Sequence, residues 1–179
     1  DWRLDLRAET DRLNSKVQQA MSISPTGKVD IIAHSFGGLL VKTYLNQLLD
    51  TSFVNKLVLV GSPQLGAPKA FKILNYGDDL GMNFFGFGLN QDKIKEISQN
   101  MPGVYELLPS QRYVQINGGY VKDFRDNQPR ILDYEQTNQF MLENPNDKRN
   151  EFLLNLSGQF HTPLDSSSIN APQIYNIVG

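Results

Sequence analysis

Apolar and polar residues alternate at helical intervals along the first part of the chain. Within residues 4–21 the apolar side chains are mostly three or four positions apart, which predicts an amphipathic helix that ends in a turn cluster at 24–27. The β-branched run at 28–34 predicts a buried parallel strand. Helical spacing with a broad apolar face follows at 39–49, and a second buried strand is predicted at 54–61. Together these elements predict a right-handed βαβ unit, the building block of an α/β sheet.

The rest of the chain predicts one more strand and a long insertion before it. Residues 174–178 form a short apolar run that suits a last strand of the same sheet. Before it, only short β-branched pieces such as 113–116 occur. Helical spacing returns at three places: 94–97, 140–142 and 152–156. We therefore expect residues 1–65 and 171–179 to form a core sheet and residues 66–170 to form an inserted cap of helices and loops.

Composition and charge narrow the classes of function. The chain has 179 residues, which is enough for one domain with a substantial core. Lys and Arg total 17 against 19 for Asp and Glu, and no basic block is present, so nothing in the charge favours binding to nucleic acid. The absence of cysteine excludes disulfides, a thiol nucleophile and a zinc–thiolate site. No stretch approaches the roughly 18 uninterrupted apolar residues of a membrane-spanning helix.

The candidate chemistry lies where the first predicted strand turns into a helix. Residues 33–38 read Ala-His-Ser-Phe-Gly-Gly, which has the small-x-Ser-x-Gly form of a nucleophile elbow. A serine at the apex of such a turn needs small neighbours two positions away, and Ala33 and Gly37 occupy those positions. We expect the Ser35 hydroxyl to be the nucleophile and the Phe36 backbone N–H to be an oxyanion donor, aided by the helix dipole. A purely structural Ser-Gly turn is the alternative.

Several motifs, in order along the chain, resemble those of the α/β-hydrolase superfamily, and within it the lecithin:cholesterol acyltransferase-like lipases and acyltransferases. They are Asp1-Trp2-Arg3, residues 29–39, Leu59-Val60-Gly61-Ser62-Pro63, Gly66-Ala67-Pro68, Leu107-Leu108-Pro109-Ser110 and Tyr175-Asn176-Ile177-Val178-Gly179. The resemblance implies a partial α/β-hydrolase sheet with a large inserted helical cap or lid. It implies transfer of an acyl group from a lipid or carboxylic ester through a serine acyl-enzyme, without a metal or organic cofactor. It also raises the possibility of contact with a membrane or lipid surface through the cap.

The same resemblance implies that part of the site lies outside these residues. In that family the triad runs Ser, Asp, His along the chain, and its Asp and His follow the strand that here ends at Gly179. The strand with the second oxyanion donor would precede Asp1, and the sequence begins without an initiator Met. We therefore expect a fragment of a longer enzyme. The residues leave hydrolysis and transfer to an alcohol equally open, because the same acyl-enzyme serves both.

The two histidines offer a second, less favoured arrangement. His34 is adjacent to Ser35 on the strand, where neighbouring side chains face opposite ways, so we expect it to be a packing residue. His161 precedes the last strand, and it could be the base only in a small intact esterase with a different chain order. The acid that orients it would then be one of three residues: Asp123, Asp126 or Asp165.

Two further alternatives stay open from the sequence. The phenylalanines within residues 82–89 lie in a glycine-rich stretch that suits a lid tip meeting lipid, or equally core filling between cap helices. The chain could also be a non-catalytic binding domain that keeps the α/β-hydrolase fold. Loss of turnover in a Ser35→Ala variant would separate an enzyme from such a domain.

Overall fold

The computed structural model describes residues 1–78, 91–143, 150–167 and 173–178. The stretch at 82–89, considered above as a lid tip, lies outside these residues. The chain forms two compact units. Unit 1 comprises Asp1–Gln64 and Ser166–Gly179, and unit 2 comprises Leu65–Asp165.

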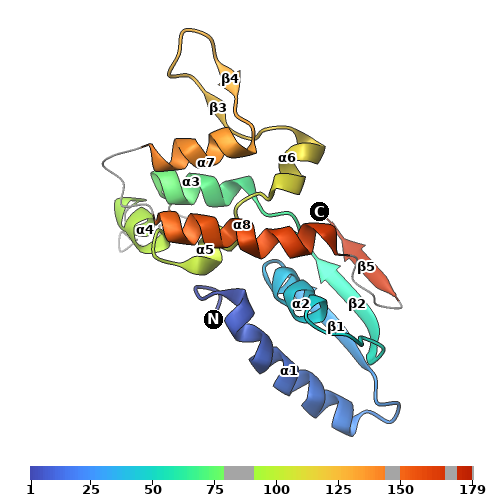
Figure 1. The fold of residues 1–179 in the computed structure, drawn as a ribbon. Coiled ribbons are helices and arrows are strands. Elements are labelled where there is room, and N and C mark those ends of the chain that lie inside the picture. Colours follow the sequence, from blue (N-terminus) through green and yellow to red (C-terminus); the bar gives the residue numbers. More distant parts are fainter. Residues whose placement is uncertain (79–90, 144–149, 168–172, 179) are drawn as a thin grey trace. The chain divides into compact units, whose positions relative to one another are not determined.

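Unit 1 is a parallel sheet with two helices. Its elements are α1 (Leu6–Ile23), β1 (Val29–His34), α2 (Gly37–Asn46), β2 (Val54–Val60) and β5 (Ile174–Ile177). The strands pair in the order β1-β2-β5, and both pairs are parallel (Figure 1). The predicted βαβ unit and last strand are therefore present, with bounds within a few residues of those read from the sequence.

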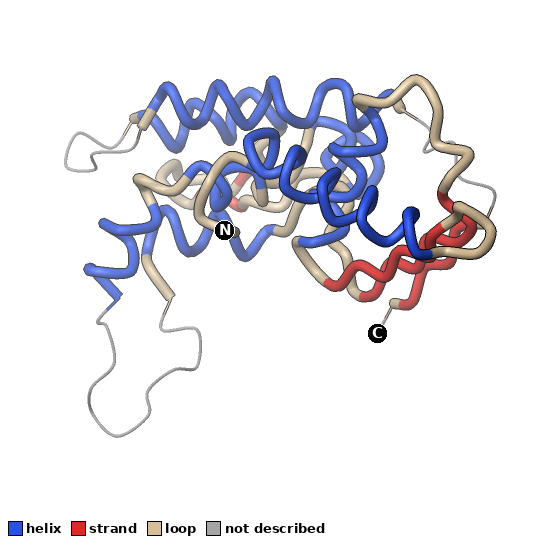
Figure 2. The backbone as a smooth tube through the Cα atoms, turned by 90° about the horizontal axis from the view of Figure 1, so that it is seen from below, coloured by secondary structure: helices blue, strands red, loops and turns tan. Residues whose placement is uncertain are grey.

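The core of unit 1 lies between the sheet and its two helices, which cover the same face (Figure 2). Val17 of α1 and Val41 of α2 pack there against Leu57 and Leu59 of β2. Helix α1 begins at Leu6 because the Asp5 carboxylate accepts a hydrogen bond from a backbone N–H of the first turn. The apolar side of the amphipathic helix α1 is therefore buried against the sheet.

The opposite face of the sheet is exposed, which corrects the prediction of fully buried strands. Ile32 is 74% exposed, and Tyr175 and Ile177 of β5 are 48% and 54% exposed. The strand register places Ile32 opposite Val58 and Val58 opposite Tyr175, so these side chains form a continuous apolar row. The prediction failed because a β-branched run reveals an apolar strand but not how many of its faces are covered.

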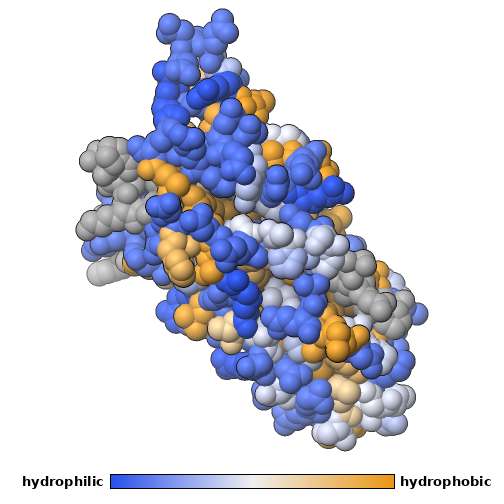
Figure 3. Space-filling model, viewed as in Figure 1, coloured by the Kyte–Doolittle hydropathy of each residue, from blue (hydrophilic) through white to orange (hydrophobic). Residues whose placement is uncertain are grey.

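Unit 2 is mainly helical. Its elements are α3 (Pro68–Tyr76), α4 (Gln91–Ser98), α5 (Pro102–Glu106), α6 (Gln111–Asn117), β3 (Lys122–Asp123), β4 (Arg130–Ile131), α7 (Tyr134–Leu142) and α8 (Glu151–Ser166). The β-branched residues at 113–116 lie in helix α6 and not in a strand. Strands β3 and β4 form a short antiparallel hairpin whose surface is mostly hydrophilic (Figure 3).

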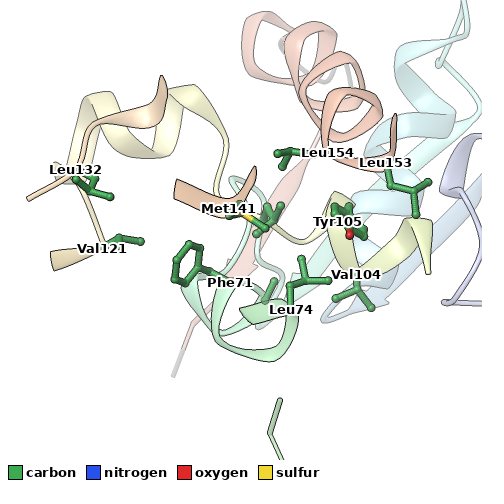
Figure 4. Close-up of a cluster of buried hydrophobic side chains, with 11 residues drawn as sticks. Phe71, Leu74, Val104, Tyr105, Val121, Leu132, Met141, Leu153 and Leu154 are labelled. Atoms are coloured by element: carbon green, nitrogen blue, oxygen red, sulfur yellow. The ribbon is translucent and has the colours of Figure 1, made fainter. Parts of the chain in front are cut away.

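The core of unit 2 joins residues that lie far apart in the sequence (Figure 4). Phe71 and Leu74 of α3, Tyr105 of α5, Met141 of α7 and Leu154 of α8 meet in one buried cluster. Because helices that are distant in sequence contribute to it, unit 2 has a hydrophobic core of its own.

Two of the sequence motifs meet in unit 2. The Ala67 N–H donates to the Leu107 carbonyl over 2.7 Å, and the Ser110 N–H donates to the Leu65 carbonyl over 2.9 Å. Between them Gly66 has a φ of 87°, and a Cβ there would lie 2.6 Å from the Leu108 carbonyl carbon. The close approach of the two segments therefore requires glycine at position 66.

Candidate functional site

Ser35 occupies a strained turn between β1 and α2. It is the single non-glycine residue with a positive φ, 51°, among those that the structure describes. A serine side chain in this region of φ costs conformational energy, and such residues cluster at functional sites. The turn is held on both sides, because the Ser35 N–H donates to the Val60 carbonyl over 2.8 Å and the Gly38 N–H donates to the Ser35 carbonyl over 3.0 Å.

The backbone N–H of Phe36 is available for a ligand. Phe36 is the N-cap residue of α2, and its carbonyl already accepts from the Leu39 and Leu40 N–H groups. Within the described ranges its own N–H makes no hydrogen bond. A helix N-terminus leaves such donors unsatisfied and carries a partial positive charge, so an anion placed here would be stabilised.

The tight packing beneath the turn falls at Gly38 and not at Gly37. A Cβ added at Gly37 would meet no neighbouring atom within 4 Å, whereas a Cβ at Gly38 would lie 2.5 Å from the Cβ of Ser62. The prediction that position 37 must be small to avoid a collision is therefore wrong in this structure. The motif read from the sequence located the turn correctly but could not show which glycine faces the neighbouring strand.

Ser62 is the residue near the turn that sequence reasoning missed. It follows β2, and its hydroxyl is buried and makes no hydrogen bond within the part of the chain that the structure describes. Strands β1 and β2 are parallel, so Ser35 and Ser62 both lie at the carboxyl edge of the sheet. That edge is where open α/β sheets bind their ligands. Ser62 lies in the quoted motif Leu59-Val60-Gly61-Ser62-Pro63, but the motif could not show its contact with Gly38.

His34 does not pack in the interior as predicted. Its side chain is exposed, on the face of β1 opposite the buried Ala33. The alternation of a strand forces this arrangement, since Ala33 and His34 must point to opposite faces and the helices cover only the Ala33 side.

His161 is buried in unit 2, with 3% of its surface exposed. Its Nε2 lies 2.9 Å from the Glu106 carbonyl oxygen, and Ser157, one turn earlier on α8, donates to the Tyr105 carbonyl over 2.6 Å. A carbonyl can only accept, so Nε2 of His161 carries a proton and Nδ1 is the basic nitrogen. Both side chains thereby contact carbonyls at the end of α5, where the Tyr105 carbonyl also accepts from the Leu108 N–H over 2.9 Å.

The three carboxylates considered as orienting acids for His161 have other contacts. Asp165 Oδ2 accepts from the Arg112 N–H over 3.2 Å, and Asp126 lies 3.9 Å from Arg130. Asp123 accepts two side-chain hydrogen bonds from Arg125, over 3.0 and 2.9 Å. No hydrogen bond joins any of the three to His161 in the described residues.

The Asp123–Arg125 pair lowers the pKa of the Asp123 carboxyl group. Hydrogen bonds from the Arg125 side chain and backbone lower the pKa of Asp123 to about 2, and the charges of Arg125 and Arg130 act in the same direction. A carboxylate held this firmly in its ionised form binds its arginine at every physiological pH. Asp123 thus stabilises the β3–β4 hairpin and is a poor candidate for proton transfer.

The parallel sheet and the strand–turn–helix at its carboxyl edge are consistent in architecture with the α/β-hydrolase class of fold, to which the chain is assigned by its structural match. A solved structure described as the crystal structure of the Tle4–Tli4 complex matches with a TM-score of 0.65 at 18% sequence identity. The match covers 98% of this chain and 42% of that chain, so the chain spans less than half the length of its structural neighbour. At this identity the likeness shows the fold alone.

The family follows from the sequence itself. The family model of lecithin:cholesterol acyltransferase matches residues 1–161. The chain therefore belongs to the lecithin:cholesterol acyltransferase family, which confirms the resemblance drawn from its motifs. A comparison with curated proteins found no match. No helix within the described ranges is both long and apolar enough to cross a membrane.

Proposed function

We propose that the protein to which this chain belongs transfers the acyl group of a lipid or carboxylic ester to water or to an alcohol, with Ser35 as the nucleophile. The observation that carries the proposal is the strained φ of Ser35 at the junction of β1 and α2, in a chain of the lecithin:cholesterol acyltransferase family. A strained strand-to-helix turn of this kind exposes a serine hydroxyl at the edge of the sheet.

The reaction proceeds in two halves. The Ser35 Oγ attacks the ester carbonyl while a base takes its proton, and the Phe36 N–H donates to the oxygen that becomes negative. Collapse of this intermediate releases the alcohol, which takes up the proton, and leaves an acyl-serine ester. Water or a second alcohol then attacks this ester by the same steps and restores the serine hydroxyl.

We assign the base to a residue outside this chain. His34 points away from the side of the sheet that carries the core, and His161 is buried in unit 2 with its Nε2 engaged by a backbone carbonyl. In the serine triad the base uses Nε2 toward the serine and Nδ1 toward an acid, and the contacts of His161 do not follow that scheme. We propose residues 66–170 as the cap of this enzyme.

The proposal is tested by labelling with a fluorophosphonate, read by intact mass, in a longer protein that contains residues 1–179. We expect stoichiometric labelling that Ser35→Ala abolishes and that Ser62→Ala, the matched control at the same edge of the sheet, retains. Labelling that survives Ser35→Ala would overturn the assignment. Absence of labelling, together with no loss of turnover in Ser35→Ala, would instead indicate a non-catalytic binding domain.

The same probe applied to the 179-residue chain examines the arrangement with His161. We expect no labelling, because the base is absent. Labelling of Ser35 in this chain that is lost in His161→Gln would show that the chain is a small intact esterase.

A further inference from the structure

A groove of about 880 Å³ runs between α7 and α8 in unit 2. This volume lies within the range of small-molecule sites, which is about 300 to 1,000 Å³. The groove is formed within one unit, and nothing in the chemistry of Ser35 uses it. Neutral hydrogen-bonding side chains provide most of its described lining: Tyr134, Asn138, Gln139, Asn155, Gln159 and Thr162.

Gly158, which lines the groove, is a residue that packing does not explain. It lies in the middle of α8, where glycine is less stable than alanine by roughly 0.5–1 kcal/mol. Among the described residues, an added Cβ would meet only the Tyr134 hydroxyl within 4 Å, at 3.5 Å, which is an ordinary contact. The missing side chain therefore serves to leave open space in front of the Tyr134 hydroxyl.

The Tyr134 hydroxyl is a lasting hydrogen-bond donor in this space. Burial raises the pKa of Tyr134 above its ordinary value, so the phenol keeps its proton throughout the physiological range. Asn138, the neighbour one turn along α7, lines the same groove. Tyr134 and Asn138 therefore present a hydroxyl and an amide at one wall of the groove.

The charges of the groove disfavour an anion. Its two charged residues in the described lining are Glu135 and Glu143, and neither lysine nor arginine is among them. Glu143 is neutralised by Arg125, whose Nη1 donates to it over 2.9 Å. A phosphate or carboxylate would therefore find no cationic partner among the described lining residues, whereas a ligand hydroxyl could donate to the Glu135 carboxylate.

We propose that the α7–α8 groove binds a neutral polyhydroxylated ligand, such as a sugar ring, above Gly158. Asparagine and glutamine amides each offer a donor and an acceptor, which matches the dual character of hydroxyl groups. Leu142 and Leu154 supply apolar surface for the C–H face of such a ring. The proposal does not rest on the ester chemistry assigned to Ser35, and its failure would leave that chemistry unaffected.

The test is a titration followed by nuclear magnetic resonance, with the side-chain amide signals of Asn138, Asn155 and Gln159 as probes. The ligands are the methyl glycosides of glucose, galactose, mannose and N-acetylglucosamine, together with myo-inositol. We expect saturable shifts of these signals with at least one of them, at millimolar concentration. No saturable shift with any ligand, or shifts with choline only, would overturn the proposal.

Variants make the test specific to the groove. Gly158→Ala should raise the melting temperature and weaken binding about tenfold, since it fills space beside the Tyr134 hydroxyl without breaking the fold. Gln159→Ala should weaken binding about three- to tenfold through a lost hydrogen bond, whereas Gln115→Ala on α6 should leave it unchanged. Binding that is equal in all four proteins would show that the shifts do not report this groove.

One more comparison distinguishes a free sugar from a lipid headgroup as the ligand that carries the hydroxyl groups. Methyl β-glucoside represents a free sugar, and octyl β-glucoside below its micelle concentration represents the headgroup of a lipid. Equal affinities indicate a free sugar, and tighter binding of the octyl compound indicates a glycolipid. Either result supports recognition of ligand hydroxyl groups in the α7–α8 groove. If Gly158→Ala left the affinity for the octyl compound unchanged, the proposal would be contradicted.

Discussion

Gly38 and Ser62 are in direct contact at the carboxyl edge of the sheet, so that a Cβ on Gly38 would lie 2.5 Å from the Cβ of Ser62. This contact joins the first turn of α2 to the residue that follows β2. It fixes where the helix begins relative to the neighbouring strand, and with it the position of the Ser35 turn. The local geometry that supports the proposed chemistry therefore depends on a glycine outside the small-x-Ser-x-Gly pattern.

Gly38→Ala should destabilise the protein by about 1–3 kcal/mol, because the added methyl group overfills a closely packed site. Gly37→Ala is the matched control, since a Cβ there meets no neighbour within 4 Å and alanine favours the helix. Urea unfolding of both variants measures the difference. Equal stabilities would contradict the packing described here.

Ser62→Gly should partly restore the stability of Gly38→Ala, because it removes the two Ser62 atoms that the new methyl group would overlap and leaves the contact with Leu59 Cδ2 at 3.4 Å. The two residues are in contact, so we expect an interaction free energy of roughly 0.5–3 kcal/mol in a double-mutant cycle. Ser62→Ala alone should change the free energy of unfolding little, since its buried hydroxyl makes no hydrogen bond in the described part of the chain. Additive effects of Gly38→Ala and Ser62→Gly on the free energy of unfolding would argue against the contact.

The two faces of the sheet should respond differently to truncation. Leu59→Ala removes a side chain that is 2% exposed in the core of unit 1, and it should cost about 2–5 kcal/mol. Ile32→Ala, on the uncovered face, should cost less than about 1 kcal/mol because Ile32 is 74% exposed. A similar loss in both variants, measured by thermal unfolding, would mean that the second face is covered in solution.

Asp123 should make the stability fall at acid pH. Arg125 holds the folded pKa of Asp123 at about 2, below the value of about 3.9 for an unfolded chain. The folded state therefore gains stability that is complete above pH 4 and is lost as the pH falls from about 4 to 2. In Asp123→Asn the urea midpoint should depend less on pH in this window, whereas the exposed Asp126→Asn should behave as the unaltered protein does.

The sequence predicted unit 1 well because its elements follow simple periodicities. Alternation and helical spacing located β1, α2 and β2 to within a few residues, and the serine motif fell at the turn where the strained φ is found. The spacing of apolar residues depends on local geometry alone, so it can be read without knowledge of the rest of the fold.

What the sequence could not predict depends on contacts between distant residues. The role of Gly38 follows from Ser62 on the next strand, and the burial of His161 follows from its bond to the Glu106 carbonyl. The exposed face of β1 depends on which other elements cover the sheet, and the strand's own residues carry no information about that. The groove beside Gly158 likewise exists only because α7 and α8 lie together.

The central claim is that Ser35 carries the acyl group, and peptide mapping of the trapped acyl-enzyme tests it most directly. A longer protein that contains this chain would be mixed with an activated ester, quenched in acid and digested with trypsin. Residues 29–42 form one tryptic peptide in which Ser35 is the sole hydroxyl side chain. The account predicts the acyl mass on this peptide and its absence in Ser35→Ala. An acyl group found instead on residues 57–69, which contain Ser62, would contradict it.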